Sequence, residues 1–138
     1  MKHTAEECRS ELRRYYFYDE MIRVLRQRYE VKDHEMTRVR TVQYDKPVSR
    51  GFSDTDRIVA VIAQKEDLAQ RIRGYRSRMK EIRQASDRMK DRLNAALLWL
   101  HFAEDVELRE LAEDTGLSVS ALSRKIREGL EEMAEAWQ

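Results

Sequence analysis

Hydroxyl and cationic side chains are concentrated between residues 118 and 127, near the end of the 138-residue chain. In a helix, most of them share one face, with Ala121 and Lys125 at its edges. Short hydroxyl side chains let a helix approach the floor of a DNA groove, and arginine pairs with guanine or holds a phosphate. The pattern predicts a surface for double-stranded DNA that consists of Ser118, Ser120, Ala121, Ser123, Arg124, Lys125 and Arg127. The alternative is the solvated outer face of a three-helix core.

Two helices joined by a tight turn are needed to position this surface. Leu108, Leu111 and Ala112 fall on one side of the first helix, and Gly116 follows where a left-handed residue would end it. Ser118 is then the expected N-cap of the second helix. Along that helix, apolar residues recur at steps of three or four: Val119, Leu122, Ile126, Leu130, Met133 and Trp137. The spacing predicts a helix-turn-helix.

An apolar segment at about residues 94–102 is expected to form the buried first helix of this C-terminal unit. Leu93, Ala96, Leu97 and Leu100 would share its buried face, and Trp99 and Phe102 would widen it. Residues 103–105 would form the turn to the next helix.

The charge of the chain is unevenly distributed. From Glu104 onward there are four basic and ten acidic residues, a net charge of −6, whereas the whole chain carries +1, so the rest must carry +7. Affinity for DNA comes largely from cations that neutralise phosphates. The cations are concentrated instead between Arg71 and Arg92, and this stretch either lies along a DNA backbone or is a solvated helix face.

Two long amphipathic helices are predicted upstream. Thr4 and Glu7 fit a capping box. An apolar stripe follows from Ala5 to about Glu30 and consists of Ala5, Cys8, Leu12, Tyr15, Tyr18, Ile22, Leu25 and Tyr29. We expect the aromatic cluster at residues 15–18 to pack against a partner helix. A loop is predicted at residues 39–53, because Pro47 and Gly51 interrupt the helical pattern.

The second long helix is expected to begin near residues 53–56. Its apolar positions follow a near-heptad spacing with a slip between Ile72 and Met79: Ile58, Ile62, Ala69, Ile72, Tyr75, Met79, Ile82, Met89 and Leu93. Lys65 and Ser86 fill polar steps of the same repeat. The two stripes must be buried against each other in an antiparallel hairpin, against a second chain, or both.

Catalytic chemistry is not predicted. The three histidines are far apart, Cys8 is the only cysteine and the four glycines are isolated, so neither a metal site nor a phosphate-binding loop is expected. We predict a protein that is not an enzyme and uses no cofactor. The polar N-terminus and the lack of a long apolar run predict a cytoplasmic protein without a membrane segment.

The segment LRELAEDTGLSVSALSRKIREGLEEM resembles region 4 of sigma-70-type factors, the helix-turn-helix that reads the promoter −35 element. The layout of the whole chain, with ELRRYYFYDEMIRVLRQ near its start and VSRGFSDTDR in its linker, is similar to phage transcriptional regulators of the RinA/ArpU type. The resemblance implies activation of phage late genes through sequence-specific DNA binding and recruitment of host RNA polymerase. It also implies that Ser118, Ser120, Ser123, Arg124 and Arg127 contact DNA.

The sequence therefore predicts an all-α protein with a long helical hairpin or coiled coil followed by a sigma region 4-like helix-turn-helix. Residues 1–86 would form the dimerising hairpin, and residues 87–138 the DNA-binding domain. We expect a homodimeric transcription regulator. Two alternatives are a phage DNA-packaging subunit of the small-terminase kind and a polymerase-binding adaptor that does not read DNA.

Overall fold

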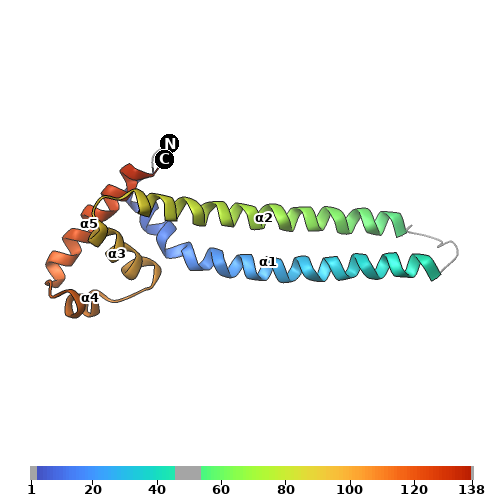
Figure 1. Cartoon of the computed structure of the whole chain (residues 1–138), viewed down its shortest axis with the longest axis horizontal. Coiled ribbons are helices and arrows are strands. Elements are labelled where there is room, and N and C mark those ends of the chain that lie inside the picture. Colours follow the sequence, from blue (N-terminus) through green and yellow to red (C-terminus); the bar gives the residue numbers. More distant parts are fainter. Residues whose placement is uncertain (1–2, 46–53, 138) are drawn as a thin grey trace. The chain divides into compact units, whose positions relative to one another are not determined.

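The computed structural model describes the backbone of residues 3–45 and 54–137, and the side chains of residues 3–38 and 55–137. The helices in these ranges are α1 (Ala5–Asp45), α2 (Asp54–Arg88), α3 (Arg92–Leu98), the single π-helical turn η1 (Trp99–Ala103), α4 (Leu108–Thr115) and α5 (Val119–Ala136) (Figure 1). No strand occurs in the described ranges. The predicted all-α class is confirmed.

Helix α1 begins at the predicted cap and is longer than predicted. The backbone N–H of Glu7 donates to Thr4 Oγ1 at 3.2 Å, and the helix continues to Asp45. The prediction of a loop is therefore wrong for residues 39–45, which contain neither glycine nor proline to interrupt the helix. The rest of that predicted loop, with Pro47 and Gly51, lies outside the described residues.

The described chain forms two compact units. One contains the described residues of Met1–Tyr18 and Ser77–Gln138, and the other is Asp19–Arg76. The predicted boundary between residues 86 and 87 divides the chain by function, into a dimerising hairpin and a DNA-binding domain, and not by packing. It stays a prediction.

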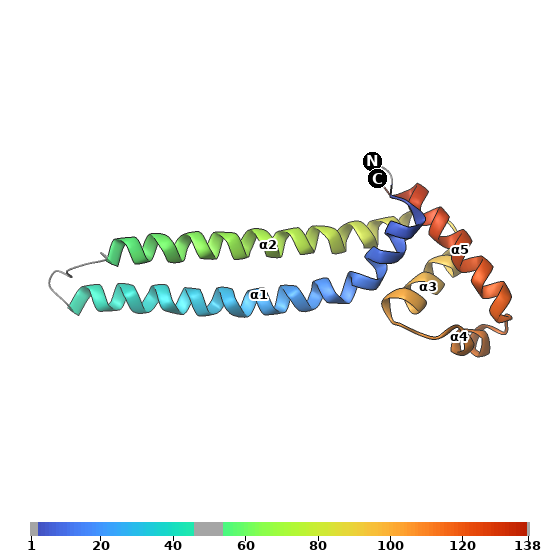
Figure 2. The same ribbon diagram turned by 180° about the vertical axis from the view of Figure 1, so that it is seen from behind.

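In the unit Asp19–Arg76, the parts of α1 and α2 lie side by side and antiparallel (Figures 1 and 2). Their facing sides bury apolar residues that include Leu25, Val61 and Leu68. Lys65 reaches from α2 to α1, where its ammonium pairs with Asp33 and lies 5.1 Å from the centre of the Tyr29 ring. The aliphatic stem of a lysine can occupy a half-buried position in this way while its charge stays near the surface.

The buried register of α2 differs from the prediction. Val61 is 5% exposed, whereas Ile62 is 38% exposed. The inward positions alternate strictly in steps of three and four, without the slip expected after Ile72: Ile58, Val61, Lys65, Leu68, Ile72, Tyr75, Met79, Ile82, Ser86 and Met89. The polar residues Lys65 and Ser86 occupy inward positions in this repeat, as the sequence predicts.

In the unit that contains both ends of the chain, aromatic residues connect the start of α1 to residues near the C-terminus. The rings of Tyr15 and Trp99 meet edge to face at 4.8 Å, and the Tyr16 hydroxyl donates to Glu104 Oε1 at 2.6 Å. Trp99 in turn donates from Nε1 to the buried Ser86 Oγ at 2.7 Å. The expectation that the aromatic cluster packs against a helix is confirmed for Tyr15, which contacts η1.

The segment from α3 to η1 buries the predicted face only in part, at Leu97 and Phe102. Leu93 and Leu100 are exposed, and the buried residues are Asn94, Ala95, Leu97, Leu98 and Phe102. Apolar residues surround this helix on nearly every side, so periodicity does not define one face. The π-helical turn, closed by the bond from Glu104 N to Trp99 O, further shifts the register after Leu98.

Candidate nucleic-acid interface

Helices α4 and α5 are joined by a turn at residues 116–118. Gly116 has φ 74°, a left-handed conformation, and its N–H donates to Ala112 O at 2.9 Å. Ser118 then caps α5, because its hydroxyl accepts from the backbone N–H of Ala121 at 3.1 Å. Both residues have the roles predicted from sequence.

A buried stripe holds α5 in place. It consists of Leu122, Ile126, Leu130 and Met133, followed by Trp137 after the helix, and Leu111 of α4 is buried as well. Val119 was expected in this stripe but is 47% exposed. Periodicity gives the direction of a side chain around the helix and does not show how far along the helix the packing extends.

The predicted contact residues are divided between an exposed face and its edges. Ser120, Arg124 and Arg127 are exposed and follow each other at helical spacing, so they share one side of α5. The half-buried residues Ala121, Ser123 and Lys125 flank this side. Ser118 is exposed, but its hydroxyl is already engaged in the helix cap.

The charges along α5 restrict where a polyanion could approach. The cations Arg124, Lys125 and Arg127 belong to its first half, and the exposed Glu128, Glu131 and Glu135 follow in its second half. The positive end of the helix dipole is also at the N-terminus. A polyanion would therefore be attracted to the first half of α5 and repelled by the second half.

Part of the basic stretch between Arg71 and Arg92 has a structural role. Arg92 Nη1 donates to the carbonyl oxygens of Ser86 and Met89 at 3.1 and 3.0 Å, near the end of α2, and Arg88 Nη1 donates to Ala136 O at 3.4 Å. Arg78 lies 5.6 Å from the centre of the Tyr18 ring. The other basic residues of the stretch are exposed. Their contact with DNA stays a prediction.

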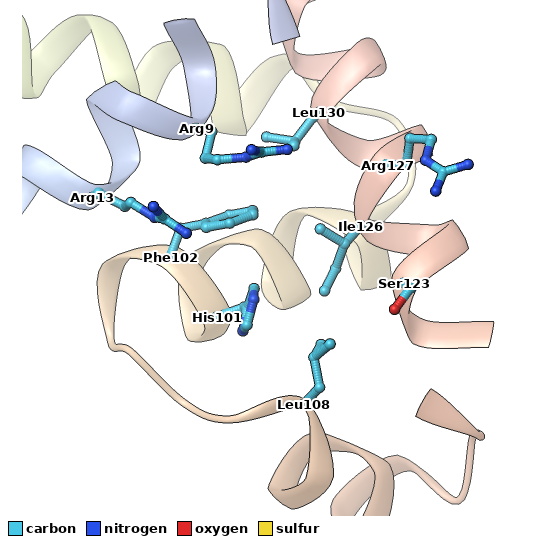
Figure 3. A pocket seen from close by; sticks show the side chains of 9 residues that line it. All are labelled: Arg9, Arg13, His101, Phe102, Leu108, Ser123, Ile126, Arg127 and Leu130. Carbon is cyan, nitrogen blue, oxygen red and sulfur yellow. The ribbon is translucent and has the colours of Figure 1, made fainter. Parts of the chain in front are cut away.

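A cavity of about 270 Å³ adjoins the predicted contact surface, and sequence reasoning missed it (Figure 3). Ser123, Ile126 and Arg127 of α5 line one side, and Arg9 and Arg13 of α1 line another. Phe102 of η1 also lines it, and its ring lies 5.9 Å from the Arg9 guanidinium carbon and 5.5 Å from that of Arg13. The sequence offers only the i, i+4 spacing of the two arginines as a signal, because their neighbours in the cavity lie about ninety positions away.

His101 lines the same cavity in a fixed orientation. Its Nδ1 lies 2.9 Å from the carbonyl oxygen of Val106, which can only accept, so Nδ1 carries the proton. The second ring nitrogen, Nε2, is then the one able to accept a hydrogen bond.

The remaining features concern metal binding, the reactivity of the one cysteine and membrane insertion. Within the part of the chain that the structure describes, no group of three or more His, Cys, Asp or Glu residues is arranged to hold a metal ion. Burial, reinforced by Glu7 and Glu11, raises the pKa of the Cys8 thiol to about 11. In the described ranges no helix is both long and apolar enough to cross a membrane.

No protein-family model, no curated protein and no solved structure matches the chain.

Proposed function

We propose that the protein is a sequence-specific regulator of transcription that inserts the first half of α5 into the major groove of DNA. The observation that carries this proposal is the exposed face of Ser120, Arg124 and Arg127 on a helix whose opposite side is buried. The turn at Gly116 and the cap at Ser118 give α4 and α5 the local features of a helix-turn-helix.

The resemblance to sigma region 4 and to RinA/ArpU-type regulators supports a more specific form of the proposal. The protein would activate late genes of a phage in the cytoplasm of its bacterial host, together with host RNA polymerase. The antiparallel α1 and α2 segments of Asp19–Arg76 would serve as the dimerising hairpin, and α3 to α5 as the DNA-binding domain.

Selection of bound sequences from random duplex DNA tests the proposal. We expect one enriched motif, with two half-sites if the protein binds as a dimer. Affinity for the motif and for a scrambled duplex is then measured over a range of salt concentrations, because contacts with phosphate make binding fall as salt rises. Absence of any enriched sequence at low salt would contradict sequence-specific binding.

Substitution of Arg124 tests the proposed reading face. Arg124→Ala is expected to weaken binding to the selected motif by about 1–3 kcal/mol and to relax specificity at one base step. Arg28→Ala, which removes an exposed arginine from the unit Asp19–Arg76, is the control and should leave specificity unchanged. If Arg124→Ala binds the motif as tightly as the parent, the assigned face is wrong.

One observation favours a second candidate, an adaptor that binds RNA polymerase without reading DNA. The exposed Glu128, Glu131 and Glu135 form an acidic second half of α5, which suits a basic protein partner better than DNA. Binding to the polymerase with no enriched DNA sequence would favour the adaptor.

A further inference from the structure

The cavity beside α5 contains a concentration of positive charge that the proposed reading face does not explain. Three arginines, Arg9, Arg13 and Arg127, and one histidine line it, and none of the described residues around it is a carboxylate. A volume of about 270 Å³ is several times the roughly 30 Å³ that a water molecule occupies in the liquid. The cavity therefore has the charge and the space for an anionic group.

Two of the arginines are oriented as a pair. Arg9 and Arg13 are four residues apart on α1, and both guanidinium groups lie near the same Phe102 ring, which is 8% exposed. Stacking on an aromatic ring holds a guanidinium in place and leaves its N–H groups able to donate in the ring plane. Figure 3 shows both side chains beside the ring.

The hydrogen bonds of Arg9 are incomplete. One of its terminal nitrogens, Nη1, pairs with Glu6 Oε2 at 3.2 Å, but its buried Nε makes no hydrogen bond with any described group. A buried N–H without an acceptor is unfavourable by about 1–3 kcal/mol. A bound oxyanion in the cavity is one way to supply that acceptor.

The position of the cavity indicates which anion it receives. Ser123 and Arg127 belong both to its wall and to the predicted DNA-contact surface, so the cavity is continuous with that surface. In Figure 3 the guanidinium of Arg127 points away from Arg9 and Arg13. Arg127 is thus directed elsewhere, and the pair from α1 is left to bind an anion in the cavity that Ser123 also lines.

We propose that Arg9 and Arg13 hold a backbone phosphate of the same DNA duplex whose bases α5 contacts. This inference rests on the proposed function and extends the DNA-binding surface to the start of the chain. It also provides cations beside an acidic C-terminal segment. Phosphate contacts of this kind fix the register of a protein on DNA and carry no sequence information.

The test compares Arg13→Gln with Arg14→Gln in the full chain. Arg14 is an exposed neighbour that lines a different cavity, together with Glu6, Glu7 and Glu11, so it is a matched control for the loss of one charge. Affinity is measured by fluorescence anisotropy for the selected duplex and a scrambled duplex across a salt series. Circular dichroism melting checks that each variant is folded.

Arg13→Gln is expected to weaken binding to both duplexes by the same factor, about tenfold. It is also expected to lower the magnitude of the slope of log affinity against log salt concentration by about 0.9. Arg14→Gln is expected to have a clearly smaller effect. Arg13→Lys keeps the positive charge, so its slope is expected to be close to that of the parent and not to that of Arg13→Gln. Arg9→Gln combined with Arg13→Gln should lower the slope further.

The contrary outcomes are distinct. If the parent binds its selected sequence and Arg13→Gln binds with the affinity and slope of Arg14→Gln, this inference is wrong and the proposed function stands. If the parent binds no duplex, both are wrong. If inorganic phosphate raises the melting temperature of the parent but not of Arg13→Gln, while DNA affinity is equal in both, the cavity holds a free phosphate and the assignment to DNA is overturned.

Discussion

Among single residues, Glu132 has a role that its neighbours on α5 do not share. Its Oε1 accepts from the backbone N–H groups of Lys90 and Asp91 at 2.6 and 3.1 Å, so it attaches α5 to the turn between α2 and α3. Glu132→Gln is expected to lower the free energy of unfolding by about 1–2 kcal/mol, because a charged acceptor is replaced by a neutral one. Chemical denaturation measures the change.

Glu131→Gln is the control for this substitution. Glu131 is exposed, and substitutions at such positions usually change stability by less than about 0.5 kcal/mol. Equal effects of the two substitutions would show that the bonds to Lys90 and Asp91 add nothing to stability.

The thiol of Cys8 makes the stability depend on pH in the alkaline range. Burial, followed by the charges of Glu7 and Glu11, raises its pKa from 9.0 to about 11, and burial with Glu11 also raises the pKa of Tyr18. Folding favours the protonated forms, so this stabilisation is complete below pH 9 and is lost as the pH rises towards 11 and beyond. The decrease in the free energy of unfolding between pH 9 and pH 11, measured by chemical denaturation, is expected to be smaller in Cys8→Ala. An equal loss in both proteins would contradict the assignment.

Sequence predicted single residues well where their role is local. Gly116 and Ser118 were identified because a left-handed C-cap and an N-cap depend on only a few neighbouring positions. Arg9 and Arg13 were missed, because their proximity to Ser123 depends on packing between residues about 110 positions apart. No local pattern reports a contact of that range.

At the scale of elements, two glycines in helices are expected to respond to alanine in opposite ways. At Gly74 in α2, an added Cβ would meet no atom within 4 Å, so Gly74→Ala should stabilise the protein by up to about 1 kcal/mol. At Gly129 in α5, the Cβ would lie 3.2 Å from Asn94 Cβ and 3.3 Å from Leu98 Cγ. Since α3 would have to move, Gly129→Ala should destabilise by about 1 kcal/mol.

Thermal and chemical denaturation of the two variants check this pair. If Gly129→Ala raised the stability, α3 and α5 could move apart without loss of packing. If Gly74→Ala lowered the stability, α2 would not be a continuous helix at that position. Each variant acts as the control for the other, because the change in side chain is the same.

The long helices show what periodicity can and cannot predict. Their existence and the buried face of α1, including Leu12, Tyr18, Ile22 and Leu25, were predicted correctly. The inward face of α2 was predicted correctly at most positions but not at Ile62 and Ala69, because these lie next to the buried Val61 and Leu68 and are equally apolar. Only the partner helix shows which of two adjacent apolar residues faces inward.

At the scale of the whole molecule, the unit Asp19–Arg76 offers apolar side chains for association. Val24, Val31, Val59 and Ile62 are exposed on α1 and α2. Because buried apolar area drives association, we expect a homodimer whose dissociation constant rises at least tenfold in Val31→Glu. Sedimentation equilibrium measures this, with the exposed Arg28→Glu as the control. A monomeric parent would contradict the expectation, and ring-sized oligomers would favour a DNA-packaging subunit.

The contact between Tyr16 and Glu104 has a consequence for how the protein is made. The two residues are 88 positions apart, and at about 5–20 residues per second a ribosome needs roughly 4–18 s to synthesise the chain between them. Trp99 and Phe102, which contact the first turns of α1, are also synthesised late, as is Trp137, whose ring stacks on His3 just before α1. During translation the first turns of α1 are therefore made several seconds before the residues that they contact, and they cannot reach their native packing until η1 and the residues after it have been synthesised.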